Sequence, residues 1–105
     1  MPLDAPYAVV VAPQADAQIK AASAWWRDNR KSAPDLLRDE LGSALLLLAE
    51  RPEIGRRLRN RTLGSVRLLV LRRTSYLLYY RVVPAAREVH IVHLRHARRR
   101  PQRPR

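Results

Sequence analysis

Residues Val66 to Leu94 read VRLLVLRRTSYLLYYRVVPAAREVHIVHL, and this stretch decides the fold. It contains three runs rich in β-branched and aromatic residues, namely Val66 to Arg73, Tyr76 to Val83 and Glu88 to Leu94. Only the short segments TS and PAAR separate these runs. Short connections of this kind predict that consecutive strands are antiparallel neighbours. The stretch therefore predicts a three-stranded β-meander.

The residues before the meander predict one more strand and two helices. Tyr7 to Ala12, YAVVVA, is an apolar run that ends at Pro13, which suits a buried strand followed by a helix. The apolar face of this first helix, which ends near Arg30, consists of Ala15, Ile19, Ala22 and Trp26. Ser32 predicts the N-cap of a second helix that stops before Pro52. Its apolar stripe consists of Leu37, Leu41, Ala44, Leu45 and Leu48.

Together these elements predict an α+β fold of order β-α-α-β-β-β, with a helical hairpin packed on an antiparallel sheet. Residues 51–65 contain Pro, Gly, Asn and Thr without periodicity, so we expect no regular element there. One domain is expected over residues 1–98, followed by a disordered basic tail at 99–105. The predicted core or near-core residues are Trp26, Leu37, Leu41, Leu45, Leu48, Val70, Tyr80 and Ile91.

Positive charge is concentrated in the second half of the chain. Residues 51–105 contain sixteen Arg against two Glu, whereas residues 1–50 contain five Lys or Arg against seven Asp or Glu. Such a half should attract polyanions or an acidic protein, in a salt-dependent manner. The sequence has no Cys, which excludes disulfides and thiolate metal sites. No window is long and apolar enough to span a membrane, and we expect a cytoplasmic protein.

Three histidines near the C-terminus raise two chemical possibilities. On a strand, His90 and His93 lie an odd number of positions apart and should point to opposite faces, which argues against a metal site. RNA cleavage by 2′-hydroxyl attack needs a base, an acid and cations. The side chains that could supply them are Arg67, Arg73, Arg81, His96 and Arg98. The alternative is that arginines alternating with apolar residues form the solvated face of an antiparallel sheet.

Four segments resemble one family of bacterial toxins. They are VVVAPQADAQIKAASAWW from Val9, LLAERPEIGRRL from Leu47, YLLYYRVV from Tyr76 and VHIVHLRHARRR from Val89. In order and spacing they resemble the ParE branch of the ParE/RelE superfamily of toxin–antitoxin modules, over roughly residues 7–100. The resemblance implies that family's β-α-α-β-β-β fold, which agrees with the order of elements predicted above.

The resemblance also implies a function. ParE-like toxins poison DNA gyrase by binding, without a cofactor, a metal or a known catalytic residue. Their partner is a ParD-like antitoxin whose acidic segment folds over the toxin, and the two form a hetero-oligomer. The residues expected to bind the target, at one end of the last two strands, are Arg81, His96, Arg98 and Arg99.

The RelE branch implies a different activity, ribosome-dependent cleavage of mRNA. The catalytic candidates for it in this chain are Arg67, Arg81 and His96. No Tyr follows Tyr80, which departs from the best-known RelE pattern and favours the gyrase hypothesis.

Overall fold

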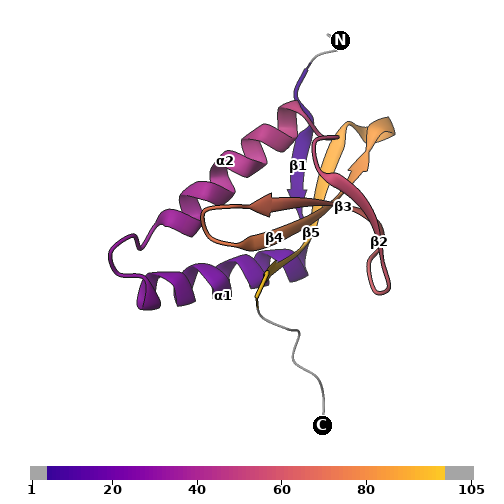
Figure 1. The fold of residues 1–105 in the computed structure, drawn as a ribbon. Helices are drawn as coiled ribbons and strands as arrows, with labels where there is room; N and C mark the ends of the chain where they lie inside the picture. Colours follow the sequence, from indigo (N-terminus) through magenta and orange to yellow (C-terminus); the bar gives the residue numbers. More distant parts are fainter. Residues whose placement is uncertain (1–4, 99–105) are drawn as a thin grey trace.

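A computed structural model describes residues 5–98 of the 105-residue chain, so Arg99 and the expected tail lie outside the described residues. Figure 1 shows two helices packed against one twisted sheet. In chain order the elements are β1 (Ala8–Val11), α1 (Pro13–Asn29), α2 (Leu36–Glu50), β2 (Arg56–Asn60), β3 (Gly64–Leu71), β4 (Tyr76–Val83), the 3-10 turn η1 (Pro84–Ala86) and β5 (Glu88–His96). The strands are arranged in the sheet as β1-β5-β4-β3-β2.

The predicted fold class is confirmed, and the sheet differs from the prediction in two details. β3, β4 and β5 form the antiparallel meander, but β1 pairs with β5 in parallel, so the sheet is mixed. Local spacing could not orient β1, because two helices and three strands separate it from its partner. The second difference is β2, which pairs with β3 where no regular element was expected. Only Leu58 of its five residues is apolar, so this edge strand has no hydrophobic alternation.

The hydrophobic core lies between the helices and one face of the sheet. As predicted, it contains Trp26, Leu37, Leu41, Leu48, Tyr80 and Ile91, and Leu45 packs against it. The prediction for Val70 is wrong, because this side chain is 46% exposed. Leu69 and Leu71 face the helices, so the intervening Val70 points to the opposite face of the sheet.

A β-bulge in β5 changes which side chains share a face. Tyr80 pairs with Ile91 and Tyr79 with His93, so Val92 is an extra residue on β5. Arg81, which pairs with His90, lies two positions after Tyr79 on β4, so Arg81 and Tyr79 project from the same face of the sheet. Their partners His90 and His93 therefore lie on that face as well. The expectation that they point to opposite faces is wrong, because the bulge shifts the alternation by one residue.

Two polar side chains on the helices bind the backbone of the sheet. Beyond the end of β1, Gln18 of α1 binds the edge of β5. The Gln18 Oε1 accepts the Leu94 N–H at 2.9 Å, and the Gln18 Nε2 donates to Nδ1 of His93 at 3.0 Å. From α2, Glu40 accepts the backbone N–H groups of Arg73 and Thr74 in the β3–β4 turn, at 2.8 and 3.0 Å. These contacts fix both ends of the sheet relative to the helices.

The second helix begins later than the sequence predicted. Its N-cap is Asp35 rather than Ser32, and no side chain caps the first turn by a hydrogen bond. The Trp26 indole donates to the carbonyl oxygen of Ala33 at 2.9 Å and so fixes the connection between the helices.

Candidate functional site

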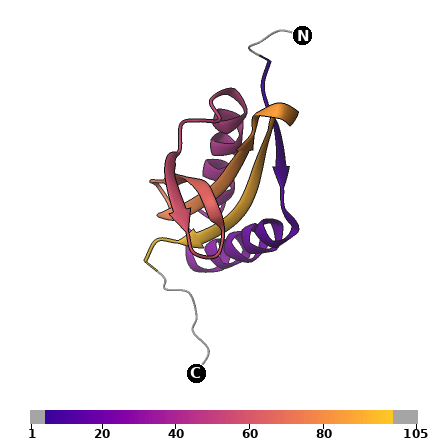
Figure 2. The same ribbon diagram turned by 90° about the vertical axis from the view of Figure 1, so that its right-hand side faces the viewer.

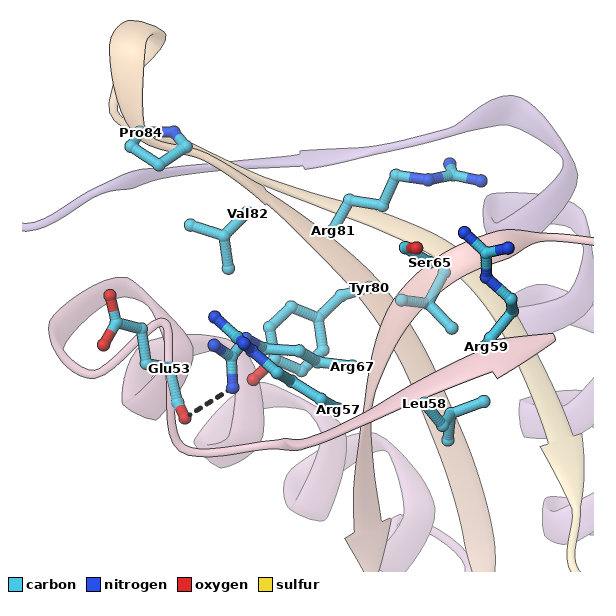
Figure 3. A pocket seen from close by; sticks show the side chains of 11 residues that line it. Glu53, Arg57, Leu58, Arg59, Ser65, Arg67, Tyr80, Arg81, Val82 and Pro84 are labelled. Carbon is cyan, nitrogen blue, oxygen red and sulfur yellow. Dashed lines mark hydrogen bonds between the residues drawn. The ribbon is translucent and has the colours of Figure 1, made fainter.

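A pocket with a volume of ≈ 580 Å³ lies where the α2–β2 loop meets β2, β3 and β4. Figure 3 shows its lining side chains. They are Glu53, Arg57, Leu58, Arg59, Ser65, Val66, Arg67, Tyr80, Arg81, Val82 and Pro84. Four of the eleven are arginines, and we call this site the arginine pocket.

Strand register explains why three of these arginines share one face of the sheet. Arg57 pairs with Arg67, Arg59 pairs with Ser65, and Arg67 pairs with Tyr80. Directly paired residues project to the same side, so these side chains lie on the face that carries the helices. Two positions from Arg67, Leu69 already packs against the core under the helices. Arg57, Arg59 and Arg67 therefore occupy the part of this face beyond the helical cover, whereas Leu58, Val66 and Arg81 line the pocket from the other face of the sheet.

The floor of the pocket is a buried tyrosine locked to the α2–β2 loop. The Tyr80 hydroxyl accepts the Gly55 N–H at 2.7 Å, and the Tyr80 side chain is completely buried. Arg67 Nη1 donates to the carbonyl oxygens of Glu53 at 3.0 Å and Gly55 at 2.9 Å, the first of which Figure 3 marks. A Cβ on Gly55 would lie 2.5 Å from the Tyr80 hydroxyl oxygen, so this close approach requires glycine.

Burial sets the protonation state of this tyrosine. It raises the pKa of Tyr80 above the ordinary value of 10.0, while the Gly55 hydrogen bond and the positive charge of Arg67 act in the opposite direction. The phenol is therefore neutral at physiological pH. Because its ring and hydroxyl are inaccessible, Tyr80 supports the pocket and does not contact a ligand.

The pocket is strongly positive. Arg57, Arg59 and Arg81 are exposed, and none of the pocket arginines forms an ion pair within residues 5–98. Arg81 donates to the carbonyl oxygen of Leu63. Glu53 is the only carboxylate in the lining. Guanidinium groups without an acidic partner bind carboxylate or phosphate oxygens well, often through two parallel hydrogen bonds. The site is thus suited to an anion.

The structure divides the residues that the sequence singled out. Arg67 and Arg81 line the arginine pocket, but His96 does not. His96 pairs with Tyr76 in β4, five positions from Arg81, which corresponds to roughly 17 Å along the strand. The expected cluster at one end of the last two strands is therefore not formed by Arg81 and His96.

His96 belongs to a second group of residues beside α1. Its ring packs edge-on against Tyr76 with the ring centroids 5.0 Å apart, and Tyr76 contacts Trp26 in turn. The backbone N–H of Arg98 donates to His96 Nδ1 at 3.1 Å, and the Arg98 side chain is exposed. Arg73, the remaining ribonuclease candidate, lies in the β3–β4 turn, where Glu40 binds its backbone.

Sequence reasoning missed two pocket residues, Arg57 and Arg59, because they lie in the segment that was expected to be irregular. Two signals could have found them. Asn60 and Gly64 bracket a three-residue turn, and the arginines alternate with Leu58 at the period of a strand. Within residues 5–98, no three His, Asp or Glu side chains come together as metal ligands. No helix there is long and apolar enough to cross a membrane.

The fold defines a class of protein, the toxins of the ParE/RelE superfamily. The chain is similar to a chain of the toxin–antitoxin complex RelBE2 from Mycobacterium tuberculosis, with a TM-score of 0.59 and 25% identity, over 87% of this chain and 91% of that one. It shares its fold with the isolated RelE toxin of E. coli, with a TM-score of 0.62 and 19% identity, over 90% of this chain and 87% of that one.

A family model identifies the branch of the superfamily to which the chain belongs. Residues 9–101 match the model of the ParE toxin of the type II toxin–antitoxin system parDE, and the chain belongs to this family. It is therefore a toxin of a type II toxin–antitoxin module. The search of curated proteins finds no match. The resemblance noted in the sequence is thus confirmed for both the family and the superfamily.

Proposed function

We propose that this toxin acts by binding DNA gyrase, that it works in the bacterial cytoplasm, and that a ParD-like antitoxin neutralises it in a hetero-oligomer. Membership of the parDE toxin family supports the target, because the ParE branch implies gyrase poisoning. The exposed Arg57, Arg59 and Arg81 are the proposed target-binding residues. Arg98 and Arg99, which follow His96 closely in the sequence, would form a separate contact.

The composition of the arginine pocket favours binding over catalysis. General acid–base cleavage of RNA needs groups that exchange protons near neutral pH, most often histidine. None of the residues that line the pocket is a histidine, and its only tyrosine is buried, with a pKa raised above 10.0. His96 packs on Tyr76 outside the pocket, away from Arg67 and Arg81. This separation is the observation that carries the proposal for a non-enzymatic toxin.

A second candidate function is ribosome-dependent cleavage of mRNA. The arginine pocket supports it, because Arg57, Arg59 and Arg67 share one face of the sheet and could bind a phosphodiester and stabilise developing negative charge. Glu53 would then have to serve as the proton acceptor, since it is the only carboxylate in the lining.

Two assays with the purified chain separate these functions. For the gyrase proposal, we expect inhibition of supercoiling and accumulation of cleaved DNA in the presence of gyrase, while mRNA on programmed ribosomes stays intact. Unchanged gyrase activity over a wide concentration range would contradict the proposal. Intact gyrase activity together with cut mRNA would establish the second function.

Matched variants connect the result to the site. Arg59 lines the pocket and Arg72 lies in the β3–β4 turn outside it, and both are exposed. We expect Arg59→Glu to weaken gyrase inhibition by about tenfold or more, because it replaces an attraction by a repulsion in the pocket. Arg72→Glu changes the net charge equally and should have little effect. We expect the His96→Ala variant to inhibit gyrase normally. A loss of gyrase inhibition in this variant would place His96 in the functional surface.

A further inference from the structure

The hairpin formed by β2 and β3 continues beyond the rest of the sheet. β3 pairs with β4 only over residues 67–71, whereas within residues 5–98 its first three residues, 64–66, pair with β2 alone. Residues 58–66 are therefore a two-stranded ribbon, and Figure 1 shows its turn standing clear of both helices. Figure 2 shows β2 on the side of the sheet opposite β1. A two-stranded ribbon is an element that can enter a groove on another molecule.

The turn of this hairpin is fixed by contacts within the chain. The Asn60 Oδ1 accepts the N–H of Thr62 at 2.8 Å and the N–H of Leu63 at 2.9 Å. Gly64 has a φ of 77°, which glycine adopts without strain. From β4, Arg81 donates to the carbonyl oxygen of Leu63. A turn that is already ordered loses less conformational entropy when it binds a partner.

The exposed side chains of the hairpin are those that bind phosphate. Apart from a glycine, the exposed residues between positions 56 and 66 are Arg56, Arg57, Arg59, Arg61, Thr62 and Ser65. This segment contains no Asp or Glu, and none of its four arginines forms an ion pair within residues 5–98. Arginine, serine and threonine contact phosphate oxygens in protein–DNA complexes, whereas protein–protein interfaces rely on apolar and aromatic anchors. The surface of the hairpin therefore favours a nucleic acid over a protein.

The arginines of the hairpin lie on both of its faces and at its turn. Arg57 and Arg59 project to the face of the arginine pocket, Arg56 projects to the opposite face, and Arg61 follows β2 in the turn. Arg57 and Arg59 lie roughly 7 Å apart along the strand, close to the separation of neighbouring phosphates in one nucleic-acid strand. Cations on both faces of a ribbon match a groove that is bordered by two phosphate backbones.

The shape and composition of the hairpin select duplex DNA among nucleic acids. The major groove of B-DNA is about 12 Å wide and admits a two-stranded β-ribbon, whereas the major groove of double-stranded RNA is too narrow. Single strands are bound largely by stacking of their bases on exposed aromatic rings. Residues 56–66 contain no aromatic residue, and Tyr80 beneath the arginine pocket is completely buried.

We propose that the β2–β3 hairpin lies in the major groove of duplex DNA, where Arg57 and Arg59 contact one phosphate backbone and Arg56 contacts the other. Because the contacts are to phosphates, binding is independent of base sequence. The inference rests on the proposed function in one respect, because it takes gyrase to supply the duplex. The toxin then recognises gyrase together with its DNA, and the arginine pocket holds phosphates rather than an acidic surface of the enzyme.

The first test measures binding of the full-length chain to a short labelled DNA duplex by fluorescence anisotropy, without gyrase. The hairpin variant combines Arg56→Gln, Arg57→Gln, Arg59→Gln and Arg61→Gln. The control variant combines the same change at four exposed positions outside the hairpin, Arg27→Gln, Lys31→Gln, Arg38→Gln and Arg72→Gln. We expect the hairpin variant to lose about 100-fold or more in affinity and the control variant to lose about threefold or less. Losses of equal size would overturn the proposal.

Single substitutions test the phosphate contacts by their salt dependence. Each lost contact between an arginine and a phosphate makes the slope of log K against log[NaCl] shallower by about 1. We expect this change in Arg59→Gln and an unchanged slope in Arg72→Gln, which lies in the β3–β4 turn. The same slope in both variants would contradict a phosphate contact of Arg59.

Competing ligands test the choice of duplex and groove. We expect double-stranded RNA and single-stranded DNA of the same sequence to bind about tenfold more weakly than the DNA duplex. Netropsin, which occupies the minor groove, should leave binding unchanged. Displacement of the chain by netropsin would overturn the assignment to the major groove. Equal or tighter binding of either competing nucleic acid would overturn the proposal for duplex DNA.

The gyrase assay separates this inference from the proposed function. Binding to DNA is measured without gyrase, so a chain that binds DNA through the hairpin and leaves gyrase unaffected would refute the proposed function alone. If the parent chain inhibits gyrase, we expect the hairpin variant to inhibit it about tenfold less and the control variant to inhibit it normally. Full inhibition by a hairpin variant that no longer binds DNA would refute only the DNA contact.

Discussion

At the scale of single residues, the glycine in α2 and the glycine in the loop after α2 differ in the space around them. Gly55 packs directly under the Tyr80 ring, where a Cβ would approach the hydroxyl oxygen to 2.5 Å and ring carbon Cε1 to 2.7 Å. Gly42 is exposed within the helix, and apart from its chain neighbours and the backbone of its own helix no atom lies within 4 Å of the position of a Cβ. The same substitution at these two positions should therefore change stability in opposite directions.

We expect Gly55→Ala to lower the free energy of unfolding by about 1–3 kcal/mol, because the completely buried Tyr80 cannot move away from the added methyl group. Gly42→Ala should raise it by about 0.5–1 kcal/mol, because alanine restricts the unfolded chain and favours the helix. Urea denaturation of both variants measures the difference. A Gly55→Ala variant with the same free energy of unfolding as the parent would show that Tyr80 is not held against the loop.

His93 makes stability depend on pH. Burial, and secondarily the positive charge of Arg95, lower the pKa of His93 below the ordinary value of 6.5. Its Nδ1 accepts a hydrogen from the amide of Gln18, an arrangement that protonation at Nδ1 would break. The unfolded chain therefore binds this proton more tightly than the folded chain does. Stability from this residue is present above pH 6.5 and is lost as the pH falls through and below that value.

We expect the urea midpoint of the protein to fall between about pH 7.5 and about pH 5.5, and the fall to be smaller in His93→Gln, which has no titrating group at this position. Unfolding of both proteins at the two pH values gives the comparison. The same fall in both proteins would assign the pH dependence to other residues.

At the scale of elements, Glu40 joins α2 to the β3–β4 turn. Its carboxylate accepts hydrogen bonds from the Arg73 N–H and from both the N–H and the hydroxyl of Thr74, the last at 2.7 Å. Thr74 is only 2% exposed, so its polar groups cannot turn to water when this partner is removed. We expect Glu40→Ala to lower the free energy of unfolding by about 2–3 kcal/mol.

The neighbouring Asp39 offers a matched control. It is an exposed carboxylate in the first turn of the same helix. Asp39→Ala should change stability by about 0.5 kcal/mol or less. Thermal unfolding of both variants tests the difference, and losses of equal size would mean that Glu40 acts through the charge of the helix rather than through the turn.

The elements also show what a sequence can reveal about this fold. Both helices and the meander were predicted, because each buries one face and therefore carries a hydrophobic period. β2 buries neither face fully and has a single apolar residue, Leu58, so only the turn after Asn60 and the alternation of Arg57 and Arg59 with Leu58 mark it. In β5 the bulge at Val92 has no sequence signature, although it decides that His90 and His93 share a face. The site was half predicted for the same reason: Arg67 lies on a recognisable strand, and Arg57 and Arg59 lie on β2.

At the scale of the whole molecule, the excess of positive charge destabilises the folded chain. The chain has a formal net charge of +12, and four arginines surround a single pocket with one carboxylate in its lining. Repulsion among like charges destabilises a compact state, and salt screens it. The isolated toxin is therefore expected to be less stable than its core would allow. An anion bound in the arginine pocket would reduce this repulsion, so that binding and stabilisation arise from the same contacts.

This argument predicts how salt affects stability. Raising NaCl from about 0.01 M to about 0.15 M shortens the screening length from about 30 Å to about 8 Å, and we expect Tm to rise. The double variant Arg57→Gln/Arg59→Gln should be more stable than the parent at low salt and should respond less to NaCl. Arg27→Gln/Arg38→Gln removes the same charge from exposed positions on the helices and should keep the response of the parent. Calorimetry measures the change of Tm with NaCl in the three proteins. An equal change in all of them would mean that the repulsion is spread over the whole surface and is not concentrated in the arginine pocket.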